Sequence, residues 1–128
     1  MPILDHVAVQ VRDLDTALNF YTNTLGLELK FRERDEAHGE AFAFLNVDGG
    51  DIELLQQLDG TWTPPPIQAP YCPHFALQCE DMDTLLKTLE EKNIPIVKGP
   101  LIIPDKVRWV YIQDPDNNII EYVQWLDQ

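Results

Sequence analysis

Two stretches, "HVAVQVRDLDTAL" at residues 6–18 and "HFALQCEDMDTLL" at residues 74–86, carry the same pattern and decide the fold. Aligned without a gap, they are identical at seven of thirteen positions, at a separation of 68 residues. The same separation relates four further pairs of residues, which are Glu53 and Glu121, Ile52 and Ile120, Gln56 and Gln124, and Asp48 and Asp116. Repetition at a fixed separation indicates a duplicated module. The chain is therefore predicted to hold two copies of one module.

A proline-rich segment separates the two copies. Residues 59–73, "DGTWTPPPIQAPYCP", hold five prolines and show no apolar periodicity, which is typical of a connecting segment. A chain of 128 residues has the length of one domain. We therefore predict a single domain at 1–128, made of module one at 1–58, a linker at 59–71 and module two at 72–128.

The hydrophobic periodicity of each copy predicts a strand, a helix and three further strands. In the first copy the strands are expected at 3–11, 27–34, 40–47 and 51–57, and the helix runs from an N-cap at Asp13 to a stop at Gly26. In the second copy the strands are expected at 72–79, 94–98, 106–113 and 118–125, and the helix at 82–92. The predicted fold class is α+β, with two tandem βαβββ modules and the helices outside.

The charge balance and the cysteines narrow the class of protein. The chain has 22 acidic and 9 basic residues, so its field repels nucleic-acid phosphates and anionic membrane surfaces. No apolar run is long enough to span a bilayer. Cys72 and Cys79 lie in one strand-like stretch, too far apart for a disulfide, and we expect two reduced thiols. These features predict a cytoplasmic protein with no nucleic-acid or membrane partner.

Each copy also places a carboxylate in an apolar, strand-like stretch. Glu53 lies in "IELLQ" and Glu121 in "IIEYVQ". Ionised carboxylates rarely leave water unless a partner or a metal binds them. Successive residues of a strand face opposite sides, so His6 and its counterpart His74 point away from the helix-covered face. We expect both histidines and both glutamates to line a cavity within a cupped, mixed β-sheet.

Two imidazoles and two carboxylates form a ligand set that Zn²⁺, Ni²⁺, Mn²⁺ and Fe²⁺ accept. The sequence therefore predicts a metal site made of His6, Glu53, His74 and Glu121. The alternative is that the sheets are duplicated for packing alone, with His–Glu hydrogen bonds across each sheet. The remaining histidine, His38, has no counterpart in the second copy and is expected to be solvated.

Three stretches resemble the vicinal oxygen chelate superfamily. They are "LDHVAVQVRDLDTALNFYTNTLGLEL" (4–29), "PHFALQCEDMDTLLKTLEEKNIPI" (73–96) and "VYIQDPDNNIIEYVQW" (110–125). This superfamily contains glyoxalase I, methylmalonyl-CoA epimerase, extradiol dioxygenases and the fosfomycin- and bleomycin-resistance proteins. The resemblance covers nearly the whole chain and implies paired βαβββ modules. Carried over position by position, the metal ligands of the family fall on the same two histidines and two glutamates.

The resemblance also implies a reaction. A glutamate at position 53 favours the glyoxalase I type, because the epimerases commonly have glutamine there and the extradiol dioxygenases leave the position unused. The implied activity is a divalent-metal-dependent lyase or isomerase that transfers a proton through a metal-bound enediolate. Its substrate would be a small carbonyl compound, a thioester or a hemithioacetal. Glu121 and Glu53 would carry the proton, and Tyr111 would position the substrate unless it only packs in the core.

The resemblance leaves several alternatives open. Gln10 stands where bacterial-type glyoxalase I enzymes tend to have arginine, so glutathione use is not implied. The alternative functions are a methylmalonyl-CoA epimerase-like enzyme, an extradiol dioxygenase-like enzyme, and a non-catalytic drug-binding protein of the bleomycin-resistance type. The implied cofactor is one divalent ion per site, Zn²⁺ or Ni²⁺ ahead of Mn²⁺, Fe²⁺ or Co²⁺. We expect a homodimer in which copy one of one chain meets copy two of the other, although intrachain sites fit the same ligands.

Overall fold

The computed structural model describes residues 1–128, and the chain divides into two compact units. The first unit is Met1–Pro66 together with Asp114–Asn118, and the second is Ile67–Gln113 together with Ile119–Gln128. Each unit contains one four-stranded sheet and one α-helix, in the order strand, helix and three strands. The predicted tandem βαβββ modules are therefore confirmed. A cavity between the two sheets stays a prediction.

The first unit is built on a mixed sheet with the strand order β1-β4-β3-β2. β1 and β4 are parallel, and the other neighbours are antiparallel. Its elements along the chain are β1 (His6–Gln10), α1 (Leu14–Leu18), the π-helix η1 (Asn19–Thr24), β2 (Glu28–Asp35), the 3₁₀ turn η2 (Glu36–His38), β3 (Glu40–Asn46) and β4 (Asp51–Gln57).

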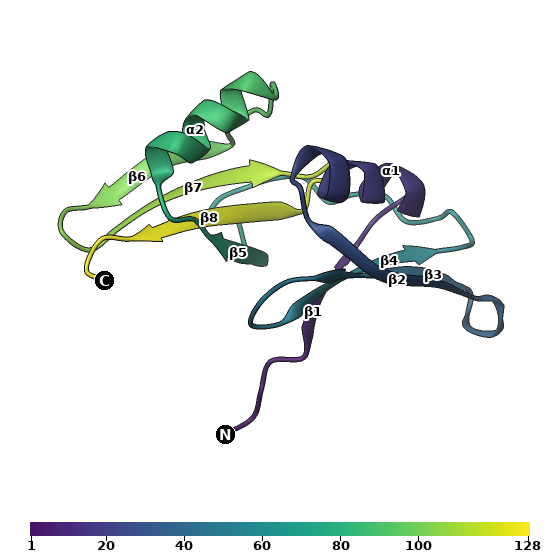
Figure 1. Cartoon of the computed structure of the whole chain (residues 1–128). Helices are drawn as coiled ribbons and strands as arrows, with labels where there is room; N and C mark the ends of the chain where they lie inside the picture. The colour runs from purple at the N-terminus through teal and green to yellow at the C-terminus, as the bar shows by residue number, and fades with distance from the viewer. The chain divides into compact units, whose positions relative to one another are not determined.

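The second unit repeats this sheet with the order β5-β8-β7-β6, in which β5 and β8 are parallel. Figure 1 shows α2 lying over one face of this sheet. Its elements along the chain are β5 (His74–Gln78), α2 (Met82–Glu91), β6 (Lys98–Ile103), β7 (Val107–Gln113) and β8 (Ile119–Trp125).

The core of each unit lies between its helix and one face of its sheet. In the first unit, Leu45 and Leu54 are fully buried against the apolar side of α1, where Ala17 is also fully buried. In the second unit, Val110 and Ile120 of the sheet and Met82 of α2 are fully buried. Alternation along each strand sends the neighbouring side chains to the opposite, less buried face. That open face carries the candidate site in both units.

Both helices begin at an aspartate cap, which is the predicted Asp13 in the first unit and Asp81, at the repeated position, in the second. The Asp13 carboxylate accepts a hydrogen bond from the Thr16 backbone N–H, and Asp81 does the same for Thr84. Capping satisfies one of the backbone donors that a helix start leaves without a partner. The repeat therefore preserves the local signal that starts each helix.

The prediction of one continuous α-helix from Asp13 to Gly26 is wrong in its second half. The α-helix ends at Leu18, and the π-helix η1 follows, with the wide hydrogen bond from Leu25 N–H to the Phe20 carbonyl at 2.9 Å. The extra residue per turn rotates the side chains that follow it. Tyr21 is then fully buried, and its hydroxyl donates to Asp114 at 2.7 Å.

The strand predicted at 94–98 is also wrong, because β6 starts only at Lys98. Ile94 instead packs in the core after α2, and Pro95 has no N–H to contribute to a sheet. The pairing of β6 with β7 is interrupted by a bulge between Lys98 and Leu101. The apolar residues that follow α2 therefore have the sequence pattern of a strand, although they pack in the core before β6 begins.

The turn "DPDNN" between β7 and β8 belongs to the first unit. The Asp114 carboxylate is almost fully buried and accepts hydrogen bonds from Tyr21, from both nitrogens of Asn118 and from the Asp116 backbone. Asp116 is also buried and accepts hydrogen bonds from the backbone and guanidinium of Arg12. These contacts fix the turn beside η1 and the end of β1.

Candidate functional site

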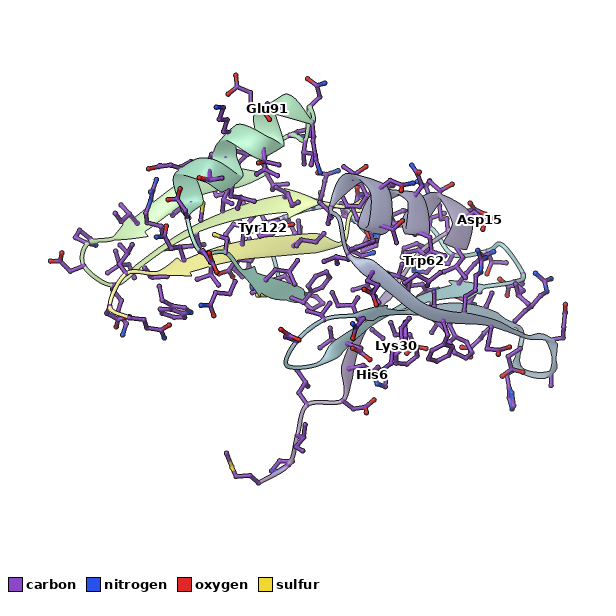
Figure 2. All side chains as sticks on the ribbon, viewed as in Figure 1. His6, Asp15, Lys30, Trp62, Glu91 and Tyr122 are labelled. Carbon is purple, nitrogen blue, oxygen red and sulfur yellow. The ribbon has the colours of Figure 1, made fainter.

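The open face of the first sheet brings His6 and Glu53 together. His6 begins β1, and the parallel register places Glu53 of β4 beside Ala8, which lies on the same face as His6. The imidazole Nε2 lies 3.4 Å from Glu53 Oε1, and the two side chains are 36% and 17% exposed. Figure 2 shows His6 on the side of the first sheet away from Asp15 of α1.

The second sheet repeats this pair at closer range. His74 begins β5, and Glu121 of β8 lies beside Ala76 in the parallel register. His74 Nε2 is 2.9 Å from Glu121 Oε1, and the side chains are 21% and 17% exposed. The separation of 68 residues found in the sequence therefore corresponds to one repeated side-chain geometry. A duplicated His–Glu contact was an expectation of both the metal and the packing interpretations.

The second ring nitrogen of each histidine indicates which tautomer a neutral ring adopts. His74 Nδ1 lies 2.9 Å from the Tyr71 carbonyl oxygen, which can only accept, so Nδ1 carries the proton. His6 Nδ1 lies 2.6 Å from the Asp5 carboxylate, which fixes the same tautomer. A neutral ring with a proton on Nδ1 presents a lone pair at Nε2. In both units Nε2 faces a glutamate oxygen.

Two acceptors that face each other need a proton or a cation between them. An Nδ1–H donor to a carbonyl or a carboxylate, with Nε2 free, is the usual arrangement of a metal-binding histidine. The residues present therefore fit a divalent metal ion, because each unit offers one imidazole nitrogen and one carboxylate. Within either unit, no three such side chains come together. The complete set of four ligands stays a prediction.

Asp5 also changes the titration of His6. The pKa of His6 is raised, chiefly because Asp5 accepts a hydrogen bond from its ring, while desolvation acts in the opposite direction. The negative charge of Glu53 also raises the pKa of His6, by a smaller amount. A metal ion that binds Nε2 must displace any proton there, so metal binding at this histidine is expected to depend on pH.

Tyr111, predicted to contact substrate, lies against the second pair. It stands opposite Glu121 in the antiparallel register of β7 and β8, and its ring centroid is 5.5 Å from that of His74. Burial and the neighbouring Glu121 raise the pKa of Tyr111, so its hydroxyl stays protonated at neutral pH and can donate. The ring of Tyr71 packs against it at 5.2 Å.

An aromatic cluster occupies the equivalent position in the first unit. Phe44 stands opposite Glu53, and its ring lies 4.9 Å from His6. Phe31 of β2 stacks on Phe44 at 5.1 Å and remains 43% exposed, and Phe42 packs edge-on against both rings. The open face of the first sheet therefore offers an apolar, aromatic wall beside the His–Glu pair.

Other expectations concern residues away from the two pairs. His38 is exposed and contacts Asp35 at 2.8 Å, as expected for a solvated histidine. Gln10 donates to Gln57 at 2.6 Å on the open face of the first sheet. Both cysteines are free, as predicted. The helices are too short or too polar to cross a membrane.

Sequence reasoning missed three neighbours of the site, namely Asp5, the Tyr71 carbonyl and Phe44. Asp5 could have been found, because it directly precedes His6 in the motif "LDHVAV". Phe44 could have been found once the register of β3 against β4 was assumed. The Tyr71 carbonyl carries no side-chain signal, and its position depends on the backbone conformation of the linker, where Tyr71 has a φ of 66°.

Comparison with known proteins extends over most of the chain. The family model of the Glyoxalase/Bleomycin resistance protein/Dioxygenase superfamily matches residues 3–122. The chain is 31% identical to Glyoxylase I 4 of Arabidopsis thaliana over 122 residues, which cover 92% of this chain and 68% of the relative. It is 32% identical to the mitochondrial methylmalonyl-CoA epimerase of Bos taurus over 99 residues, which cover 73% of this chain and 56% of the relative.

Solved structures show the same fold. TnmS3, an antibiotic binding protein from Streptomyces sp. CB03234, aligns with a TM-score of 0.74. The alignment covers 98% of this chain and 97% of TnmS3, at 22% sequence identity. At that identity, the likeness concerns the fold alone.

Proposed function

Because the chain belongs to the Glyoxalase/Bleomycin resistance protein/Dioxygenase superfamily, we propose that it is a divalent-metal-dependent lyase or isomerase of the glyoxalase I type. Its substrate is a small carbonyl compound, a thioester or a hemithioacetal, and the reaction moves a proton at the carbon next to the carbonyl. The observation that carries this proposal is the repeated pair, in which a histidine Nε2 lies 3.4 Å from a glutamate oxygen in the first unit and 2.9 Å in the second.

Four side chains would hold the metal ion in this proposal, which are His6, Glu53, His74 and Glu121. The bound ion would act as a Lewis acid towards the substrate carbonyl and so make the adjacent carbon more acidic. Zn²⁺ or Ni²⁺ suits this mixture of nitrogen and oxygen ligands, and Mn²⁺, Fe²⁺ and Co²⁺ are further candidates. The chain itself supplies the groups that move the proton.

Glu121 takes the proton from the substrate carbon and returns it to the product. A general base must ionise and reach the proton directly, and this carboxylate lies on the open face with 17% of its side chain exposed. Tyr111 stands opposite Glu121 and donates its hydroxyl hydrogen to a substrate oxygen, which orients the substrate. Glu53 can exchange the proton on the other side of the substrate, because it occupies the repeated position.

We propose further that the working form is a cytoplasmic homodimer. Copy one of one chain and copy two of the other then supply the ligands of each site. Each unit brings together one histidine and one glutamate, so in this proposal each pair is half of a site and the arrangement of the chains decides how four ligands meet. The exposed, proline-rich stretch 59–73 can extend by about 3 Å per residue, long enough to separate the copies.

Metal analysis and one substrate assay test this function together. The purified protein is stripped with a chelator, loaded with Zn²⁺ or Ni²⁺, and assayed with the hemithioacetal of methylglyoxal and glutathione. We expect metal-dependent turnover, loss of metal binding in His6→Ala and His74→Ala, and full binding in His38→Ala as the matched control. If the stripped protein and both site variants bind metal like the wild type, the metal site is refuted.

The same experiment separates the enzyme classes. Metal binding without turnover of the hemithioacetal, combined with epimerisation of a methylmalonyl thioester, would favour the epimerase-like alternative. Oxygen uptake with a catechol would favour the dioxygenase-like one. Glutathione itself is not required by the proposal, because Gln10 is neutral at the position where bacterial-type glyoxalase I enzymes tend to have arginine.

A binding protein without catalysis is the second candidate, and the aromatic cluster favours it. Phe31 and Phe44 stack with an interplanar angle of 9°, and Phe31 is 43% exposed. Such a surface suits a flat, apolar ligand. Tight binding of a planar drug by the metal-free protein, lost in Phe31→Ala but kept in His6→Ala, would support this function over the enzyme.

A further inference from the structure

One carboxylate outside the candidate ligand set lies directly on a candidate metal histidine. Asp5 Oδ2 is 2.6 Å from His6 Nδ1, the ring nitrogen on the far side from Glu53. Because a carboxylate accepts and does not donate, this contact places the ring proton on Nδ1. It also orients the ring so that Nε2 faces Glu53. Asp5 therefore controls both the tautomer and the direction of the imidazole.

The backbone before β1 holds Asp5 in place. The Asp51 N–H donates to the Asp5 carbonyl at 3.0 Å. The preceding residue packs closely on Gly50, where an added Cβ would lie 2.8 Å from the Leu4 side chain and 3.2 Å from the Leu4 carbonyl oxygen. Asp51 itself is already engaged, since its carboxylate accepts from Lys30 and from the Val47 backbone. Asp5 is consequently the carboxylate available to His6.

The second module reaches the same tautomer by another route. The position that matches Asp5 is Pro73, whose side chain has no acceptor. There the Tyr71 carbonyl accepts from His74 Nδ1 instead. The duplicated histidines therefore differ in their supporting acceptor, which is a charged carboxylate at His6 and a neutral carbonyl at His74. A carboxylate makes the ring a stronger electron donor than a carbonyl does.

We propose that Asp5 is a positioning residue of the metal site, which holds His6 as an Nε2 ligand and strengthens it. The inference rests on the proposed metal-dependent function. Loss of such a supporting group typically lowers metal affinity by about 10- to 100-fold. Asp5 is 88% exposed, so water screens the contact and the lower end applies. We expect a loss of about tenfold on removal of the carboxylate.

The test compares Asp5→Ala and Asp5→Asn with the wild type. Calorimetric titration of the metal-free protein with Zn²⁺ measures the affinity of the site. Asp5→Ala should bind Zn²⁺ about tenfold more weakly, and Asp5→Asn should fall between, because its amide oxygen still accepts from Nδ1 but carries no charge. Asp35→Asn is the matched control, since Asp35 makes the same kind of contact to His38, at 2.8 Å, away from the site.

Nitrogen NMR of the histidine side chains in the metal-free protein provides a second readout. The wild type should show the proton on Nδ1 of both His6 and His74. Asp5→Ala should move His6 towards a mixture of tautomers and leave His74 unchanged, which is an internal control for folding. A tautomer of His6 that does not move, together with an affinity within twofold of the wild type, would overturn the role of Asp5.

The His6→Ala variant separates failure of this inference from failure of the proposed function. If His6→Ala loses Zn²⁺ binding and Asp5→Ala does not, the metal site stands and Asp5 has no part in it. If His6→Ala binds Zn²⁺ like the wild type, the proposed metal function fails first, and the inference about Asp5 fails with it.

Discussion

Replacement of Tyr21 by phenylalanine is expected to destabilise the first unit by about 2 kcal/mol at neutral pH. Tyr21 is fully buried, Asp114 is 1% exposed, and the hydroxyl donates to the carboxylate at 2.7 Å. A hydrogen bond to a charged group contributes about 1.5–3 kcal/mol, and phenylalanine keeps the packing of the ring. Because Asp114 retains its three other hydrogen bonds, the middle of that range applies.

The destabilisation caused by Tyr21→Phe should also depend on pH, and the pKa shift of Asp114 gives the direction of that dependence. Burial raises the pKa of Asp114 above its ordinary value of 3.8, while hydrogen bonds from Asn118 and Tyr21 lower it. The stability linked to this raised pKa is fully present below 3.8 and is lost as the pH rises through the folded-state pKa. Removal of the hydroxyl raises that pKa further. The cost of Tyr21→Phe is therefore largest at neutral pH and shrinks towards about pH 4.

Urea denaturation at both pH values measures the two free energies of unfolding. Tyr122→Phe is the matched control, since burial, rather than a hydrogen bond, raises the pKa of Tyr122 to about 12. It should cost no more than about 0.5 kcal/mol. The reasoning is refuted if Tyr21→Phe costs as little as the control, or if its cost grows as the pH falls.

Three further predictions concern catalysis, the first helix and assembly. Glu121→Gln should retain the wild-type circular dichroism and lose about 10³-fold in turnover, because an amide cannot accept the proton; unchanged turnover would remove Glu121 from the base role. Asp13→Ala should cost about 1 kcal/mol in urea unfolding at neutral pH, since it removes the acceptor for two hydrogen bonds from Thr16. Those bonds lower the pKa of Asp13, so the difference should disappear as the pH falls through that pKa, and a cost that persists in acid would contradict the cap. A mixture of inactive His6→Ala and Glu121→Gln chains should regain activity if subunits share sites; no recovery despite verified subunit exchange would show intrachain sites.

The repeat explains why so much of the fold could be predicted from the sequence. Alternation of apolar and polar residues in a strand and a capping residue at the start of a helix are local patterns. In a duplicated chain each of these patterns occurs twice, which makes it easier to recognise. Both caps, at Asp13 and Asp81, and both His–Glu pairs follow from that repetition. The fixed separation then identified two odd glutamates as one position of a module, which single-residue reasoning could not have done.

The wrong predictions fall where tertiary contacts override local pattern. The π-helix η1 has no signal in "NFYTNT", and its wide turn is coupled to the hydrogen bond between Tyr21 and Asp114, residues that lie 93 apart in the chain. The start of β6 depends on which of the apolar residues after α2 are buried in the core. Ile94 is buried there, and β6 begins only at Lys98. Contacts between residues distant in the sequence cannot be read from periodicity.

Duplication has kept the geometry of the two pairs and changed the chemistry around them. Phe44 stands opposite Glu53, whereas Tyr111 stands opposite Glu121, so a hydroxyl donor lies beside only one of the glutamates. The charged acceptor Asp5 lies on only one of the histidines. In the proposed function the Tyr111 hydroxyl orients the substrate, which favours the adjacent Glu121 as the proton carrier. The apolar wall beside Glu53 instead suits the part of the substrate that does not react. The two modules therefore place their His–Glu pairs in equivalent positions, but we propose different catalytic roles for the two pairs.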